Sequence, residues 1–127
     1  QEGGLTLVKR APKKQQETLK KLDALEKQDL IAQEKFETLH LQLAAILRFY
    51  VESCHGLKAQ EQTTEEFIKE IAHSPHFNLE QQHLLKFFLQ MADLVKFATF
   101  EPGSDVSQEA WLSIRNFVLT TGRASGV

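Results

Sequence analysis

The chain has 127 residues, of which 42% are hydrophobic and 25% charged, and its formal net charge is −2. This length fits one domain with a sizeable core, and the apolar share argues against wholesale disorder. The small net charge argues against a dedicated nucleic-acid-binding protein, because such proteins usually carry a basic face.

Charge is unevenly distributed along the chain. Residues 1–13 are polar, basic and interrupted by two glycines and Pro12, which predicts a basic linker. Residues 1–27 hold seven Lys and Arg against four Asp and Glu, whereas residues 28–127 hold eight against thirteen. A basic lead-in therefore precedes an acidic domain. The chain begins at QEGG without an initiator methionine, so we expect it to be part of a longer protein.

The first predicted helix spans residues 14–33. Its apolar stripe is thin, so we expect it to be loosely anchored to the rest of the domain. The stripe consists of Leu19, Leu22, Leu25 and Leu30. The bundle domain proper is predicted to span residues 34–121. It opens with a strongly periodic helix that ends near Gly56, a residue suited to the left-handed conformation after a helix.

Two capping boxes mark the helices that follow. Thr63 and Glu66 have the spacing at which each side chain bonds the backbone of the other, and Phe67 begins the buried side of a short helix. Asn78 and Gln81 repeat this arrangement at the start of the next helix.

The helix of about residues 79–99 is the most apolar segment of the chain. A helix that is apolar on most sides must be surrounded by others, so we expect a largely buried central helix. Pro102 disfavours helical geometry at the residue before it and explains the stop. A last helix is predicted from a cap at Ser107 to Gly122, followed by a disordered tail, residues 122–127. The predicted fold class is all-α, a small bundle of four to five helices.

No catalytic, cofactor-binding or metal-binding constellation is expected. His73, His76 and His83 do not supply the three or four converging donors that a zinc site needs. Cys54 is predicted at the negative end of a helix, where a thiolate is disfavoured. We therefore predict that the chain is not an enzyme. A pocket that brings several histidines and carboxylates together would revive the enzymatic hypothesis.

The segment DLVKFATFEP, residues 93–102, is the candidate partner-binding site. Two phenylalanines stand three apart among charged residues at a predicted helix end, and aromatic residues with a charged rim suit an interface hot spot. Large aromatic residues are most often buried, so the same rings are also suited to closing the core. The sequence leaves both interpretations open. The candidate residues are Asp93, Lys96, Phe97, Phe100 and Glu101.

The segments TTEEF and DLVKFATFEP resemble the C-terminal cytosolic region of BatD-like (aerotolerance) bacterial membrane proteins and related uncharacterised families. In these, a Thr-x-x-Glu-Phe segment precedes a helix that ends in a sequence like (L/V)-x-F-A-x-(Y/F)-x-P. The likeness covers about residues 35–121 and departs from the family pattern at Thr99 and Phe100. The matching positions are Thr63, Glu66, Phe67, Val95, Phe97, Ala98, Phe100 and Pro102.

The resemblance implies a domain on the cytoplasmic face of the bacterial inner membrane, after a single transmembrane helix. Such proteins are usually encoded near a MoxR-type AAA+ ATPase and von Willebrand factor A-type proteins. The basic lead-in agrees, because cytosolic flanks of spanning helices are rich in Lys and Arg. We therefore expect a non-enzymatic protein–protein interaction (adaptor) domain with partners of these kinds and no cofactor. The alternative is a regulatory or nucleic-acid-binding domain whose electrostatic arm runs from Lys9 to Lys27.

Overall fold

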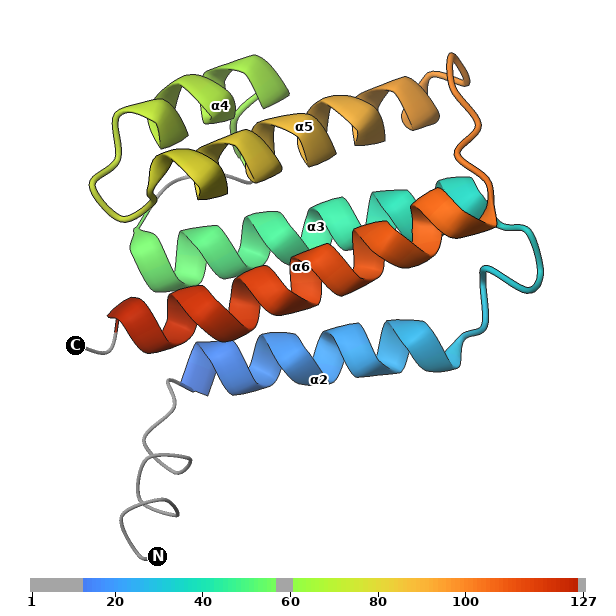
Figure 1. Cartoon of the computed structure of the whole chain (residues 1–127), viewed down its shortest axis with the longest axis horizontal. Helices are drawn as coiled ribbons and strands as arrows, with labels where there is room; N and C mark the ends of the chain where they lie inside the picture. The colour runs from blue at the N-terminus through green and yellow to red at the C-terminus, as the bar shows by residue number, and fades with distance from the viewer. Residues whose placement is uncertain (1–12, 57–60, 126–127) are drawn as a thin grey trace, which may run out of the picture.

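The computed structural model describes the backbone of residues 13–56 and 61–125, and in these ranges it is all-α. The helices are α2 (Lys13–Lys27), α3 (Phe36–His55), α4 (Thr64–Ala72), α5 (Leu79–Lys96) and α6 (Ser104–Ser125). Helices α2, α3 and α6 pack against one another, and the α4–α5 hairpin lies along the other side of α3 (Figure 1). The predicted fold class, a small helical bundle, is confirmed.

Helix α3 is the central element of the bundle. It packs against α2, α5 and α6, and its residues Leu43, Leu47 and Tyr50 are fully buried. The prediction had placed the helix of about residues 79–99 at the centre. Helix α5 instead packs chiefly on α3 and α4, and it leaves the side chains of Phe87 and Leu94 70% and 47% exposed. An apolar composition measures how much surface favours burial, but the neighbours of a helix decide how much of that surface is covered.

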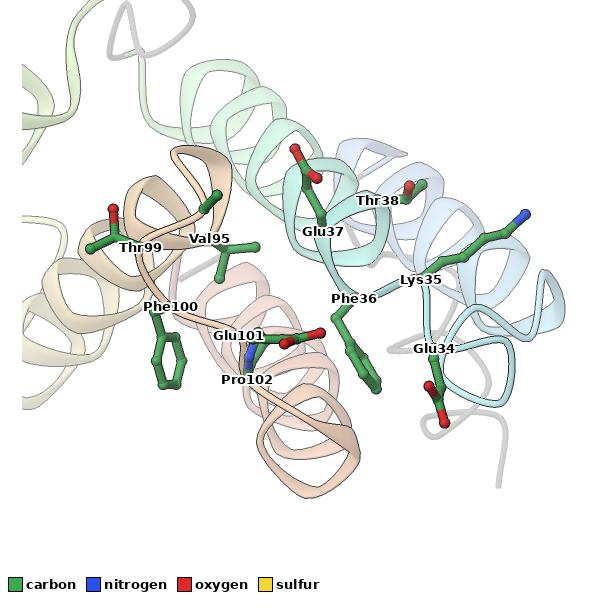
Figure 2. Close-up of a pocket in the computed structure, with 11 residues that line it drawn as sticks. Glu34, Lys35, Phe36, Glu37, Thr38, Val95, Thr99, Phe100, Glu101 and Pro102 are labelled. Atoms are coloured by element: carbon green, nitrogen blue, oxygen red, sulfur yellow. The ribbon is translucent and has the colours of Figure 1, made fainter.

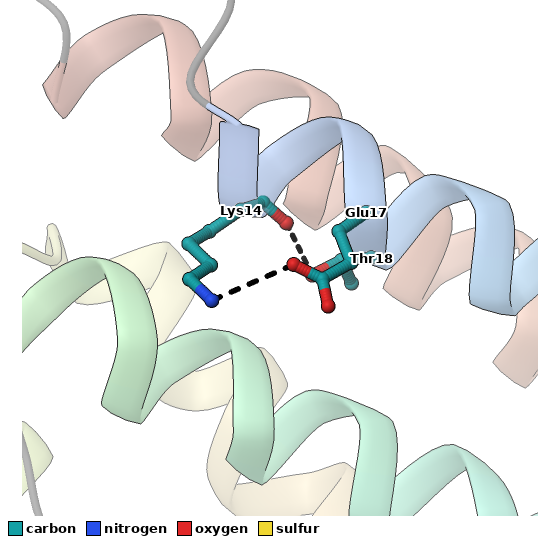
Figure 3. A network of polar contacts seen from close by, with 3 residues as sticks. All are labelled: Lys14, Glu17 and Thr18. Atoms are coloured by element: carbon teal, nitrogen blue, oxygen red, sulfur yellow. Dashed lines mark hydrogen bonds and ion pairs between the residues drawn. The ribbon is translucent and has the colours of Figure 1, made fainter.

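Buried polar residues complete the inner face of α2. Gln15 and Thr18 are buried beside the leucines of the stripe. The Thr18 hydroxyl donates a hydrogen bond of 2.6 Å to the Lys14 carbonyl within its own helix, so its burial leaves no unpaired donor (Figure 3). On the outer side, the Lys14 ammonium lies 3.5 Å from a carboxylate oxygen of Glu17 (Figure 3). The contact face of α2 is therefore wider than its leucines alone indicate.

Side-chain hydrogen bonds also hold α2 to α6. The Trp111 indole N–H donates to the Leu22 carbonyl at 2.9 Å, and the Gln15 amide donates to the Val118 carbonyl at 3.0 Å. The expectation of a loosely anchored helix over residues 14–33 is therefore corrected in two ways. Buried leucines and hydrogen bonds to α6 anchor the helix, and it ends at Lys27. Residues 1–12 of the predicted linker lie outside the described residues.

The two predicted capping boxes and the predicted stop at Gly56 are confirmed. The Thr63 hydroxyl accepts from the Glu66 amide at 3.1 Å, and the Glu66 carboxylate accepts from the Thr63 amide at 3.0 Å. Asn78 and Gln81 exchange the same pair of bonds at 2.8 and 2.9 Å. Gly56 adopts a left-handed φ of 75° after α3. These contacts join residues close in sequence, so local spacing suffices to predict them.

The last helix is longer than predicted at both ends. It begins at Ser104, after Gly103 with a φ of 69°, so Ser107 is a buried residue within the helix and not its cap. It runs through Gly122 to Ser125, since one glycine in a helix costs only about 1 kcal/mol relative to alanine. Most of the expected disordered tail is therefore helical, and residues 126–127 lie outside the described residues.

Candidate functional site

Helix α5 ends in a left-handed turn built without glycine. Ala98 has a φ of 59°, its amide donates to the Val95 carbonyl at 3.0 Å, and the Thr99 amide donates to the Leu94 carbonyl at 2.8 Å. This pair of bonds is the Schellman motif of helix ends. The turn separates Phe97 from Phe100, which the sequence had placed three residues apart at one helix end.

Phe100 lies at the edge of a hollow of about 800 Å³, which we name the Phe100 hollow (Figure 2). The hollow lies between the start of α3 and the segment that joins α5 to α6. Phe36, Val95 and Pro102 are buried and form its apolar part. Its lining consists of Glu34, Lys35, Phe36, Glu37, Thr38, Val95, Ala98, Thr99, Phe100, Glu101 and Pro102. An apolar base with polar side chains around it is typical of ligand-binding surfaces.

Carboxylates outnumber ammonium groups around the Phe100 hollow. Among the described residues that line it, Glu34, Glu37 and Glu101 stand against one cation, Lys35, and all four side chains are exposed. Within the described residues, none of the three carboxylates accepts a hydrogen bond or forms an ion pair. In Figure 2 the Glu101 carboxylate lies between the rings of Phe100 and Phe36. The hollow therefore combines exposed aromatic surface with an acidic rim.

Phe97 belongs to a different hollow, of about 480 Å³, between α3, α5 and the start of α4. Asp93, Lys96 and Arg48 also line it. The Arg48 guanidinium donates to the Gln62 carbonyl at 3.0 Å and to the Thr64 hydroxyl at 2.9 Å. Burial lowers the pKa of Arg48, and the negative charge of Asp93 opposes this shift. Arg48 is therefore engaged in holding α4 against α3.

The five candidate residues of DLVKFATFEP are thus divided between two hollows. Phe97 is 69% exposed and Phe100 is 39% exposed, so neither ring closes the core. Val95 and Pro102, which flank them in the sequence, are buried instead. Of the two interpretations that the sequence left open, exposure at an accessible surface agrees with the structure, and core closure does not.

No protein-family model, curated protein or solved structure matches the chain. The resemblance to BatD-like proteins therefore stays a prediction. Within residues 13–56 and 61–125, no three His, Cys, Asp or Glu side chains converge as metal ligands. In the same part of the chain, no helix combines the length and the apolarity that crossing a bilayer requires.

Four of the residues that match the family pattern, Thr63, Glu66, Phe67 and Pro102, have structural roles here. Thr63 and Glu66 cap α4, and Phe67 is fully buried in the core beneath Arg48, whose guanidinium carbon lies 5.2 Å from the ring centroid. Pro102 is buried beside the Phe100 hollow. These positions hold the α4–α5 hairpin and the following turn in place, which positions Phe100 and its neighbours.

His40 is a buried titratable residue that the sequence analysis did not single out. Its Nε2 lies 3.1 Å from the Ser107 hydroxyl, and its ring stacks on Phe88 with centroids 6.3 Å apart. Its Nδ1 is buried and, within the described residues, has no hydrogen-bond partner. The position could have been found from the sequence, because it lies four residues after Phe36 and three before Leu43, on the apolar face of α3.

Burial lowers the pKa of His40, so the imidazole is neutral in the folded protein at neutral pH. In the unfolded chain it titrates near pH ~6.5. As the pH falls below that value, the unfolded state binds a proton that the folded state resists, so stability is lost on acidification. Between pH ~7.5 and pH ~5.5 we expect His40 to remove up to about 1.4 kcal/mol from the free energy of unfolding. Urea unfolding at the two pH values measures this loss.

Two variants separate the contribution of His40 to the pH dependence of stability from that of other titratable groups. His40→Leu cannot take up the proton, so its stability should change less with pH than that of the wild type. The control His83→Gln removes an exposed histidine and leaves His40 in place, so the loss of stability assigned to His40 should remain. Equal pH dependence in the wild type and in His40→Leu would contradict the assignment.

Proposed function

We propose that this chain is a non-enzymatic protein–protein docking domain and that the Phe100 hollow receives an apolar segment of the partner. The observation that carries the proposal is an aromatic ring, 39% exposed, at the edge of a hollow of about 800 Å³ with a buried apolar base. Interfaces concentrate their binding energy in such places, where an anchor side chain enters a pocket and polar groups surround it. The volume of the Phe100 hollow lies within the range of about 300–1,000 Å³ that ligand sites usually have.

We propose in addition that the domain acts at the cytoplasmic face of a bacterial inner membrane, with an AAA+ ATPase or a von Willebrand factor A-type protein as partner. This part of the proposal rests on the resemblance of TTEEF and DLVKFATFEP to BatD-like proteins and on the basic lead-in. Co-purification of the full-length protein with a protein of either kind from its native cell would test it.

The alternative function, nucleic-acid binding through the basic lead-in, has less support. Among its lysines that the structure describes, Lys14 lies 3.5 Å from the Glu17 carboxylate. The Lys21 ammonium lies 3.5 Å from the centroid of the Phe49 ring and makes a cation–π contact. These two cations are therefore partly engaged by neighbouring side chains. Retention on DNA or RNA that falls steeply with salt would favour the alternative.

A random peptide library displayed on phage and selected against the immobilised protein tests docking directly. Peptides that bind at the Phe100 hollow should shift the amide resonances of Phe36 and Phe100. Phe100→Ala should weaken their binding by at least about fivefold, because truncating a hot-spot residue costs more than about 1 kcal/mol. Circular dichroism and urea unfolding establish that the variant keeps its fold.

The matched control is Phe87→Ala, which removes an equally large exposed ring from α5 outside the Phe100 hollow. Binding of the selected peptides should not change in this variant. The docking proposal fails if no peptide is enriched, or if the enriched peptides bind Phe100→Ala as tightly as the wild type.

A further inference from the structure

The two helix ends that border the Phe100 hollow have opposite electrostatic character. Val95 and Ala98 belong to the C-terminal end of α5, which carries a negative partial charge, and Phe36 to Thr38 form the N-terminal end of α3, which carries a positive one. Each amounts to about half an elementary charge, so the two nearly cancel. The side chains around the hollow therefore decide its electrostatic potential.

Those side chains make the hollow negative. Glu34, Glu37 and Glu101 carry three negative charges against the one positive charge of Lys35, and the three carboxylates have no partner among the described residues. All four lie within one concave surface, so a ligand there is exposed to their combined field. An acidic ligand would face like charges, whereas a basic ligand would gain partners that the carboxylates lack.

The apolar part of the surface limits the ligand further. Phe100 offers an exposed ring, and the buried side chains of Phe36, Val95 and Pro102 form the apolar base beside it. A small inorganic cation would leave this surface uncovered. Lysine and arginine side chains suit it, because their methylene stems pack on apolar surface while the charged end reaches the carboxylates. Arginine can in addition stack on an aromatic ring and bind one carboxylate through two hydrogen bonds.

We propose that the Phe100 hollow binds a basic, partly apolar protein segment, in which a Lys or Arg residue lies next to an apolar anchor residue. Charge complementarity assigns this partner, and the inference rests on the docking function proposed above. The apolar anchor packs on Phe36, Val95 and Pro102, and the cation lies between Glu101 and Glu34.

Peptides enriched from the random library provide the test, together with copies in which each Lys and Arg is replaced by Gln or by Glu. The enriched peptides should be basic, and the Gln copies should bind several times more weakly. Glu101→Lys should weaken binding of the parent peptides about two- to fivefold, because an exposed ion pair contributes up to about 1 kcal/mol. Their affinity should also fall with added salt, because exposed charges are screened within about 10 Å at 0.1 M.

A gain of affinity gives a result that partial unfolding cannot imitate. Lys35→Glu removes the cation found among the described residues that line the hollow and should strengthen binding of the basic peptides about two- to threefold, since exposed charge pairs contribute up to about 1 kcal/mol. The new carboxylate lies at the N-terminal end of α3, where a negative charge also stabilises the helix. The control Glu26→Lys makes the same charge change as Glu101→Lys on the exposed surface of α2, outside the hollow, and should leave affinity unchanged.

The outcomes distinguish this inference from the docking proposal. Suppose that the enriched peptides are neutral or acidic, require Phe100, and bind Glu101→Lys as tightly as the wild type. The docking proposal then stands, and the inference of a basic partner is wrong. If Lys35→Glu weakens binding, the basic partner is wrong as well. If no peptide is enriched, the docking proposal fails, and the inference that rests on it fails too.

Discussion

Replacing Trp111 by alanine should lower the free energy of unfolding by about 3–5 kcal/mol, the usual cost of removing a large buried aromatic side chain. Trp111 is buried in α6, and its indole N–H donates to the Leu22 carbonyl of α2 at 2.9 Å. The variant therefore loses packing and a link between two helices that are distant in the sequence. Urea unfolding measures the loss, and faster amide hydrogen exchange in α2 than in α3 would show that α2 detaches first.

Trp111→Phe separates the two contributions of the indole. Phenylalanine keeps much of the buried surface but has no N–H to donate, which costs about 1 kcal/mol for the hydrogen bond in addition to a smaller packing loss. It should therefore be clearly less destabilising than Trp111→Ala. If Trp111→Ala costs less than about 1 kcal/mol, far below the range for a buried aromatic residue, α2 is held loosely, as the sequence alone had indicated.

Local features of the fold could be predicted from the sequence because they depend on residues a few positions apart. The capping boxes of Thr63 with Glu66 and of Asn78 with Gln81 need only a spacing of three and the right side chains. The left-handed Gly56 after α3 follows from its lack of a side chain. Such interactions form wherever the helix forms, so no knowledge of the tertiary structure is needed.

The packing of the helices could not be predicted in the same way. Gln15 is polar, so a pattern of apolar positions assigns it to the surface. Its amide nevertheless donates a hydrogen bond to the carbonyl of Val118, which lies 103 residues further along the chain. His40 and Ser107 likewise meet across 67 residues. These polar groups are buried because a partner satisfies them. The partner is known only once α6 is placed against α2 and α3.

The candidate site was predicted in part. The segment that ends α5 does expose Phe97 and Phe100, as a docking surface requires. Its turn was missed, because Ala98 adopts a left-handed conformation that sequence rules assign to glycine. The acidic rim was also missed, because Glu34 and Glu37 are more than sixty residues before Glu101 and belong to the start of α3. Only the fold brings these two segments to one hollow.

The positions of α3 and α5 in the bundle lead to the second large effect. Leu47→Ala in α3 should lower the free energy of unfolding by about 2–5 kcal/mol, whereas Phe87→Ala in α5 should change it by less than about 0.5 kcal/mol. Leu47 is fully buried, and Phe87 is 70% exposed although its side chain is larger. Urea unfolding of both variants at one pH provides the comparison.

A central α5, surrounded by other helices, would reverse this order, since truncating a buried phenylalanine costs about 3–5 kcal/mol. Leu85→Ala serves as the control within α5, because Leu85 is fully buried on the face toward the core. It should lower the free energy of unfolding as much as Leu47→Ala does. A large effect of Leu85→Ala beside a small effect of Phe87→Ala would show that α5 packs on the core through one face only. If Phe87→Ala destabilises the protein as strongly as Leu85→Ala, both faces of α5 are buried. Helix α3 is then not the only central helix of the described bundle. The outer face of α5 would then already be covered, and Phe87→Ala would no longer be a neutral control for docking at the Phe100 hollow.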